Sequence, residues 1–314
     1  MGKRSRAAGA VVLLAGPTAS GKSRLALELA LRRDGVVINA DSMQVYRDLR
    51  VLSARPVAED EATAAHHLYG HVGAATRYSV GAWLADAAIA LAEARTAGRP
   101  AIVVGGTGLY FKALTEGLAA IPAIPATLRA DILAESAGVA SAELHARLAA
   151  VDPEDAAAIR PSDRTRIVRA LEVFAATGSS HAAWKRTAGS PPLVDAGAAQ
   201  RLVLMPDRTE LHRRIAERAE RMVHGGALEE VRALLALGLN PDLPAMKAIG
   251  VRELRDHLAG KTSLEEATTA IKTETRRYAK RQMTWFRNQM GDWRTVESAS
   301  ALDLLGGPAY INHL

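Results

Sequence analysis

The chain has 314 residues, of which 48% are hydrophobic and 24% charged, so it can bury a full core and suits one or two domains. It has no cysteine, which excludes disulfides, zinc ribbons, iron–sulfur sites and thiol nucleophiles, and favours a cytoplasmic location. The net charge of +6 and the pI of about 9.7 favour a polyanionic partner or an anionic substrate.

The first residues resemble a signal peptide, because Lys3, Arg4 and Arg6 precede an apolar run from Ala7 to Ala15. That run continues directly into a glycine-rich motif, which cleavage at this point would destroy. No other stretch approaches the roughly 18 apolar residues that span a bilayer. We therefore expect neither a signal peptide nor a membrane segment.

Three short apolar runs predict buried strands at 11–14, 36–38 and 101–104, and helical patterns cover 23–33 and 80–97. Continuous apolar strands that alternate with helices are typical of a parallel sheet covered on both faces. The functional groups of such a sheet lie on loops at the carboxyl ends of its strands.

Beyond residue 120 the strand pattern disappears, and Ala-rich helical segments follow one another as far as about Ser190. A strand at 201–205 then returns to the sheet, and helices continue from Glu210 to about Arg287 with a break at Gly225-Gly226. The expected divisions are 1–120 for the first part of the core, 121–192 for a helical insertion, 193–292 for the return strand and C-terminal helices, and 293–314 for a tail.

Gly16-Pro17-Thr18-Ala19-Ser20-Gly21-Lys22-Ser23 matches G-x-x-x-x-G-K-[ST], directly after a strand and before a helix. Backbone N–H groups of such a loop and the helix N-terminus bind phosphate, the Lys22 ammonium reaches the terminal phosphates, and the Ser23 hydroxyl ligates Mg²⁺. The fold class predicted is α/β, a P-loop NTPase-like parallel sheet flanked by helices, with an inserted all-helical domain.

Two further strand ends carry polar residues. Asp41 follows the second strand, where its carboxylate suits a general base, although helix N-capping explains such an Asp equally well. Gly105-Gly106-Thr107-Gly108 follows the third strand and has no acid where a P-loop NTPase usually has its Walker-B aspartate. That difference argues against an ordinary ATPase.

Two clusters have competing interpretations. His66, His67 and His71 suggest a transition-metal site with Asp60 and Glu61, but no second cluster completes the ligand set, so ordinary surface histidines are favoured. Arg214, Arg218 and Arg221 share one helix face. They are either solvated partners of Glu217 and Glu220 or a clamp for anions over the phosphate loop.

Residues 272–287 contain six Lys or Arg against one Glu, with Tyr278, Trp285 and Phe286 between them. Aromatic residues at this spacing usually pack in a core, but so many uncompensated cations favour contact with a phosphate backbone. The expected insertion carries a second cationic run, Arg160, Arg164, Arg166 and Arg169. Two separate basic regions favour a polyanion that spans both domains.

Several motifs together resemble the tRNA dimethylallyltransferases, also called tRNA isopentenyltransferases, along nearly the whole chain. They are the phosphate loop at 16–23, Asp-Ser-Met-Gln-Val-Tyr at 41–46, His-His-Leu at 66–68, Gly-Gly-Thr-Gly-Leu-Tyr at 105–110, Asp163 through Arg169-Ala-Leu-Glu172, Met-Lys-Ala-Ile-Gly at 246–250 and Tyr-Ala-Lys-Arg-Gln at 278–282. The sequence departs from the family pattern at Val251, where an aromatic residue is common, and at Ala65, where proline is common.

The resemblance implies transfer of a dimethylallyl group from its diphosphate to the exocyclic amine of the adenine 3′ of the anticodon. Lys22, Mg²⁺ on Ser23, and Arg218 then neutralise the departing diphosphate, so no Walker-B acid is needed. Asp41 is the implied general base, and Thr18 and Thr107 line the reaction channel. The target base must leave its stack to reach them.

The resemblance and the basic helix together imply a set of contacts with tRNA. These residues are Asp41, Ser42, Met43, Gln44, Thr107, Arg129, Thr165, Arg166, Ile167, Val168, Arg169, Lys247, Ala248, Ile249, Gly250, Val251, Arg252, Lys280 and Arg281. Recognition of this kind depends on shape and on splayed loop bases. A monomer suffices for this activity.

Two other functions compete with this prediction. A small-molecule or nucleoside kinase could use the same loop on ATP, but it leaves the basic regions unexplained. A non-catalytic, NTP-dependent RNA-binding switch explains the loop and the basic regions, but gives Asp41 and Thr107 no role.

Overall fold

The structure is a computed structural model that describes residues 10–187 and 189–297. The signal-like residues 1–9 and most of the expected tail at 293–314 lie outside the described residues. By their internal contacts the described residues form two compact units. We call residues 10–115 with 193–297 the sheet unit and residues 116–192 the helical unit, and describe each by itself.

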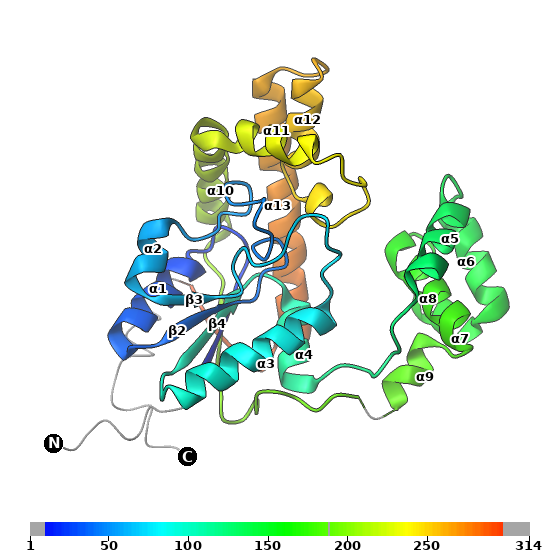
Figure 1. Cartoon of the computed structure of the whole chain (residues 1–314), viewed down its shortest axis with the longest axis horizontal. Helices are drawn as coiled ribbons and strands as arrows, with labels where there is room; N and C mark the ends of the chain where they lie inside the picture. The colour runs from blue at the N-terminus through cyan, green and yellow to red at the C-terminus, as the bar shows by residue number, and fades with distance from the viewer. Residues whose placement is uncertain (1–9, 188, 298–314) are drawn as a thin grey trace. The chain divides into compact units, whose positions relative to one another are not determined.

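A parallel sheet, six-stranded within the described residues, lies at the centre of the sheet unit (Figure 1). Its strands are β1 (Val11–Ala15), β2 (Val36–Asn39), β3 (Ala65–His67), β4 (Ala101–Gly105), β5 (Gln200–Leu204) and β6 (Arg294–Val296). Their order is β3-β2-β4-β1-β5-β6, and all neighbours pair in parallel. All six carboxyl ends therefore lie at one edge.

Helices of the sheet unit cover the sheet and extend beyond its carboxyl edge. They are α1 (Lys22–Arg33), α2 (Ala58–Thr63), α3 (Val80–Thr96), α4 (Gly108–Glu116, whose last residue belongs to the helical unit), α10 (Arg208–Met222), the π-turn η1 (Val223–Ala227), α11 (Leu228–Ala236), the 3-10 turn η2 (Ala245–Lys247), α12 (Val251–Leu258) and α13 (Leu264–Gln289).

Several hydrophobic cores hold the sheet unit together, two of them large and a small one that joins Leu211 and Ile215 of α10 to Ala279 of α13. Leu25 and Leu29 of α1 pack with Val12, Leu14 and neighbouring strand residues on one face of the sheet. The second core joins the loop at 43–52 to helices α10 to α13. It fixes the long helix α13, drawn in orange in Figure 1, against α10 and α12.

The helical unit contains α5 (Ala126–Ser136), α6 (Ser141–Val151), α7 (Pro153–Ala158), α8 (Arg164–Thr177) and α9 (His181–Arg186). Leu144 and Leu148 of α6 pack against Ile167 and Val168 of α8 in a core of its own. Helices α7, α8 and α9 begin with side-chain caps from Asp152, Asp163 and Ser180, respectively.

The predicted fold class is confirmed, but the sequence analysis missed the two outer strands. Both β3 and β6 have three residues, and neither is a continuous apolar run. His66 and His67, considered above as metal ligands, belong to β3. No described helix combines the length and hydropathy needed to cross a membrane.

Candidate active site

The loop after β1 forms an anion site from backbone N–H groups. Ala19 has φ 63° and Gly21 has φ 94°, so two residues of the loop adopt the left-handed conformation. Alternating conformations of this kind turn successive N–H groups inward as a nest. Gly21 is also the N-cap of α1 and gives its first turn no side-chain cap, which leaves those N–H groups for a ligand.

Lys22 lies in this loop with its ammonium group turned back onto the chain. Its Nζ donates to the Pro17 carbonyl oxygen over 3.2 Å. Desolvation by burial lowers the pKa of the ammonium, Asp41 raises it and Arg218 lowers it, with a net value of about 8. A bound diphosphate would raise this pKa, because anions stabilise an ammonium.

Helix α10 places two arginines on the phosphate loop. Arg214 Nη1 donates to the Ser20 carbonyl oxygen over 3.0 Å, and Arg218 Nη2 donates to the Thr18 hydroxyl. Burial lowers the pKa of Arg218 to about 10, and Asp41 raises it. Arg221, the third member of the predicted face, is exposed.

The solvated-face interpretation is therefore wrong for Arg218, whereas Arg214 also pairs with Glu210 of its own helix. Glu217 pairs with Arg213, and Glu220 pairs with Lys272 and more distantly with His224. The acids proposed as partners of Arg214 and Arg218 therefore pair with other cations. The contacts of Arg214 and Arg218 favour the clamp.

Asp41 follows β2 in a turn held by Asn39. Asn39 Oδ1 accepts from the Asp41 N–H, and Asn39 Nδ2 donates to the carbonyl oxygens of Asp41 and Leu68. Asp41 Oδ1 accepts from the Met43 N–H over 2.9 Å, which is an Asx turn, and residues 41–46 form no helix for Asp41 to cap. Within the described residues no hydrogen-bond donor reaches Oδ2.

Thr107 follows β4 and touches the Asp41 segment. Its hydroxyl accepts from the Ser42 N–H over 2.9 Å and donates to Ser42 Oγ over 3.3 Å, while its N–H donates to the Ala40 carbonyl. A Cβ at the neighbouring Gly106 would lie 3.4 Å from Asp41 Oδ2. The loops after β2 and β4 are thus in direct contact.

Helix α13 packs closely against the loop after β4. A Cβ at Gly106 would lie 2.3 Å from Gln282 Nε2, and one at Gly108 would lie 2.1 Å from the Trp285 ring. Only glycine permits this approach at either position. The basic helix predicted from sequence therefore packs directly on the loop that contains Thr107.

The charge of Asp41 acts on several groups around it. Burial, and after it the charge of Asp41, raises the pKa values of Tyr69, Tyr110 and Tyr278. The same carboxylate acts on Lys22 and Arg218. The Asp41 carboxylate therefore interacts electrostatically with groups of the phosphate loop, α10, α4 and α13.

The structure does not gather the predicted histidines into a metal site. His66 Nδ1 contacts the Ala64 carbonyl, His67 approaches Glu93, and His71 contacts Asp86 and Tyr78. No group of three or more His, Asp or Glu residues among those described could hold a metal ion. Ser23 is exposed in the first turn of α1, and its hydroxyl oxygen is a hard donor of the kind that suits Mg²⁺.

The predicted tRNA contacts in the sheet unit differ in exposure. Arg252, Lys280 and Arg281 are exposed, as is Lys247, which pairs with Asp242. Ala248 and Val251 are buried in the second core, where Met43 and Ile249 pack against it. Gln44 is buried too, and its Nε2 donates to the carbonyls of Ser53 and Ala54. Gly250, with φ 103°, packs on Leu52.

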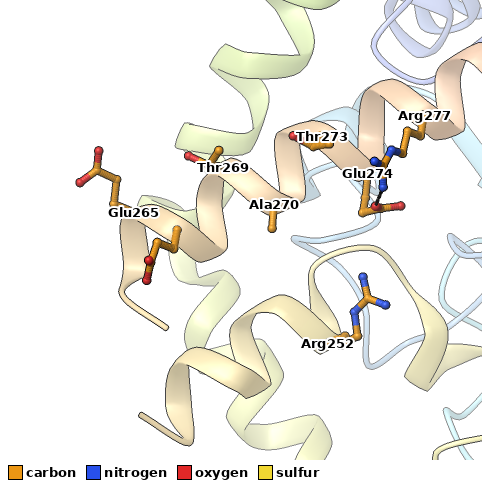
Figure 2. Close-up of a pocket in the computed structure, with 8 residues that line it drawn as sticks. Arg252, Glu265, Thr269, Ala270, Thr273, Glu274 and Arg277 are labelled. Atoms are coloured by element: carbon orange, nitrogen blue, oxygen red, sulfur yellow. Dashed lines mark hydrogen bonds and ion pairs between the residues drawn. The ribbon is translucent and has the colours of Figure 1, made fainter. Parts of the chain in front are cut away.

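Several cations of α13 have hydrogen-bond or ion-pair partners, although the sequence suggested that they are uncompensated. Lys272 pairs with Glu220, Arg277 pairs with Glu274, and Arg276 donates to Thr273 Oγ1. Arg281 lies 5.8 Å from the Tyr278 ring centroid. Between α12 and α13 an open groove of about 470 Å³ is lined in part by Arg252, Glu274 and Arg277 (Figure 2).

In the helical unit, Glu172 is buried and holds two of the predicted arginines. Glu172 Oε2 lies 3.0 Å from Arg169 Nη1 and 3.5 Å from Arg129 Nε. Thr165 and Arg166 are exposed, whereas Ile167 and Val168 belong to the core. Arg164, from the second cationic run, donates to the carbonyls of Ser136 and Val139 and so serves the fold.

Gln282, the last residue of the motif at 278–282, received no role from the sequence, although it contacts two loops of the site. A usable signal was present: Gln282 lies four residues from both Tyr278 and Phe286, so it is a polar residue in the buried stripe of α13. A polar side chain in such a stripe requires hydrogen-bond partners.

Comparisons with known proteins agree along the chain. The family model described as IPP transferase matches residues 44–289, and the model described as isopentenyl transferase matches residues 9–70. The tRNA dimethylallyltransferase of Methylobacterium nodulans is 56% identical over 94% of this chain and 97% of its own length. That of Agrobacterium fabrum is 53% identical over 91% of this chain and 96% of its own length.

Two solved structures are similar. The full-length tRNA isopentenylpyrophosphate transferase of Bacillus halodurans has a TM-score of 0.64 at 34% identity, covering 92% of this chain and 90% of that one. A eukaryotic dimethylallyltransferase, crystallised acting on tRNA, has a TM-score of 0.77 at 26% identity. That alignment covers 96% of this chain and 78% of the eukaryotic one.

Proposed function

This chain belongs to the IPP transferase family and is a tRNA-modifying prenyltransferase; from that premise we propose its reaction in atomic terms. The adenine exocyclic nitrogen 3′ of the anticodon attacks C1 of dimethylallyl diphosphate. A C–N bond forms, the C1–O bond breaks and diphosphate leaves with the bonding electron pair. Asp41 Oδ2 takes the proton that the nitrogen loses. The products are N6-dimethylallyladenosine and diphosphate.

One relationship supports this assignment best: the charge of the Asp41 carboxylate raises the pKa values of both cations of the phosphate loop site, Lys22 and Arg218. A base on one side and an anion site on the other are what an amine nucleophile and a diphosphate leaving group require. Lys22 and Arg218 stabilise the charge that develops on the diphosphate. Thr18 and Thr107 line the passage between the two substrates.

We assign the diphosphate site to Gly16, Pro17, Thr18, Ala19, Ser20, Gly21, Lys22, Ser23 and Arg218. The Ser23 hydroxyl would hold Mg²⁺ together with diphosphate oxygens, and the ion supplies Lewis-acid charge neutralisation of the leaving group. The sequence left the role of Arg214 undecided. We propose that it supports the loop through its hydrogen bond to the Ser20 carbonyl oxygen.

We propose that tRNA contacts both units, through the exposed cations of the sheet unit and through Arg129, Arg166 and Arg169 of the helical unit. The buried members of the predicted set, such as Ile167 and Val251, support these segments from within. The cytoplasmic location and the monomeric state expected from the sequence remain part of this proposal.

The test is to incubate the protein with unmodified tRNA, dimethylallyl diphosphate and Mg²⁺, digest the RNA and identify the nucleosides by mass spectrometry. Prenylated adenosine that requires the protein and both substrates supports the proposal. Consumption of ATP that depends on a small acceptor and is indifferent to RNA would support the kinase instead. tRNA binding without transfer, unaffected by Asp41→Ala, would support the RNA-binding switch.

A further inference from the structure

Gln282 of α13 joins two loops of the proposed active site with a single side chain. Its Oε1 accepts from the Thr18 N–H over 2.9 Å, and its Nε2 donates to the Gly106 carbonyl oxygen over 2.8 Å. The residue is 5% exposed. One buried amide therefore connects the phosphate loop after β1 to the loop after β4.

The two bonded positions lie on opposite sides of the proposed reaction. Thr18 belongs to the loop that holds the diphosphate, and Arg218 contacts its hydroxyl. Gly106 precedes Thr107, whose hydroxyl contacts Ser42 beside the proposed base. A rotation or loss of the amide would change the distance between the leaving group and the base without removing either.

Both loops are adapted to the Gln282 amide. The Thr18 N–H bonds to Gln282 and so does not point toward phosphate. Gly106 has no Cβ, and a methyl group there would lie 2.3 Å from Gln282 Nε2. A primary amide can accept with its oxygen on one side and donate with its nitrogen on the other while remaining uncharged.

We propose that Gln282 is a positioning residue that sets the separation of the diphosphate loop from the base and Thr107. It touches neither substrate. Proximity and orientation act on the bound complex. Loss of the Gln282 amide therefore lowers kcat for prenyl transfer, with little change in the KM for either substrate. This inference rests on the proposed function.

The first test is Gln282→Met, which keeps the volume and removes both hydrogen bonds. We expect kcat to fall about 10- to 100-fold, with the Kd for tRNA and the KM for dimethylallyl diphosphate within about threefold of wild type. The matched control is Thr268→Val, another buried polar residue of α13, whose hydroxyl bonds only to the Leu264 carbonyl of its own helix. The control should keep wild-type kcat.

The second test is Gln282→Glu, which has a pH signature that a merely structural role does not produce. A protonated carboxyl can accept from Thr18 and donate to Gly106, whereas a carboxylate can only accept. The ratio of variant to wild-type kcat should therefore rise as pH falls through the pKa of the introduced acid.

A third variant tests the contact from the other side. Gly106→Ala keeps Gln282 but displaces its amide, so it should reproduce the kcat defect even if Gln282→Met does not fold. Wild-type kcat in folded Gly106→Ala and Gln282→Glu proteins, or a loss confined to tRNA affinity, would overturn the inference. Absence of prenylated adenosine with the wild-type protein would instead reject the proposed function itself.

Discussion

The guanidinium of Arg218 donates a hydrogen bond to the hydroxyl of Thr18, 200 residues earlier in the chain. The backbone N–H of the same threonine bonds to Gln282, so helices α10 and α13 both hold the phosphate loop at one residue. The loop motif alone specifies an anion site. These two helices supply the cation and the fixed distance to the base that the proposed prenyl transfer requires.

Replacing Lys22 by alanine should abolish most turnover while tRNA binding changes less, because the ammonium acts on the leaving diphosphate. We expect kcat to fall about 10²- to 10³-fold. Initial rates at saturating tRNA and a separate tRNA binding measurement check this. Lys261→Ala, an exposed lysine between α12 and α13, is the control. An equally active Lys22→Ala protein would refute our placement of the diphosphate.

Asp41→Asn should remove the base and preserve the turn, because an amide oxygen can still accept from the Met43 N–H. Loss of a general base should cost about 10²- to 10⁴-fold in kcat. The measurement is single-turnover transfer beside tRNA affinity, which we expect to be unchanged. Asp195→Asn, an exposed turn residue that accepts from Gly197 N–H, serves as control. Full activity of Asp41→Asn would rule out the assigned base.

The pKa of Lys22, lowered to about 8 in the free protein, predicts a pH dependence. The cationic form binds diphosphate, so kcat/KM for dimethylallyl diphosphate should be constant below this pKa and fall up to about tenfold per pH unit above it. In Lys22→Arg the descending limb should disappear, since a guanidinium stays protonated. A wild-type profile that is flat to about pH 9.5 would contradict this assignment.

Arg169→Ala should weaken tRNA binding severalfold and lower the slope of log Kd against log salt by about one, as expected for one lost phosphate contact. Arg147 lies in the same unit, is exposed and pairs with Glu143, so Arg147→Ala controls for the change in net charge. Binding titrations across salt concentrations measure both. An equal change in slope for the two variants would show that Arg169 has no specific contact.

Much of the fold was predictable because it depends on local patterns. The strands β1, β2, β4 and β5 are apolar runs bounded by turns, and the phosphate loop has its own motif. The edge strands β3 and β6 were not predicted, because three-residue strands depend on pairing with a neighbour rather than on their own sequence.

The site was predictable as a set of residues but not as a set of contacts. Arg214, Arg218 and Arg221 are equivalent by helical spacing, and only the packing of α10 on the phosphate loop separates the first two from the third. The role of Gln282 likewise depends on how closely α13 approaches Gly106. Such tertiary distances are not encoded in any local periodicity.

The most direct test of the central claim is to count products in one reaction that contains an anticodon stem-loop RNA, dimethylallyl diphosphate, Mg²⁺ and no ATP. The proposed reaction predicts one diphosphate released for each prenylated adenosine formed, with both products lost in Asp41→Asn. Prenylation that requires ATP, or diphosphate release without prenylated adenosine, would contradict the claim that the phosphate loop holds the leaving group of prenyl transfer.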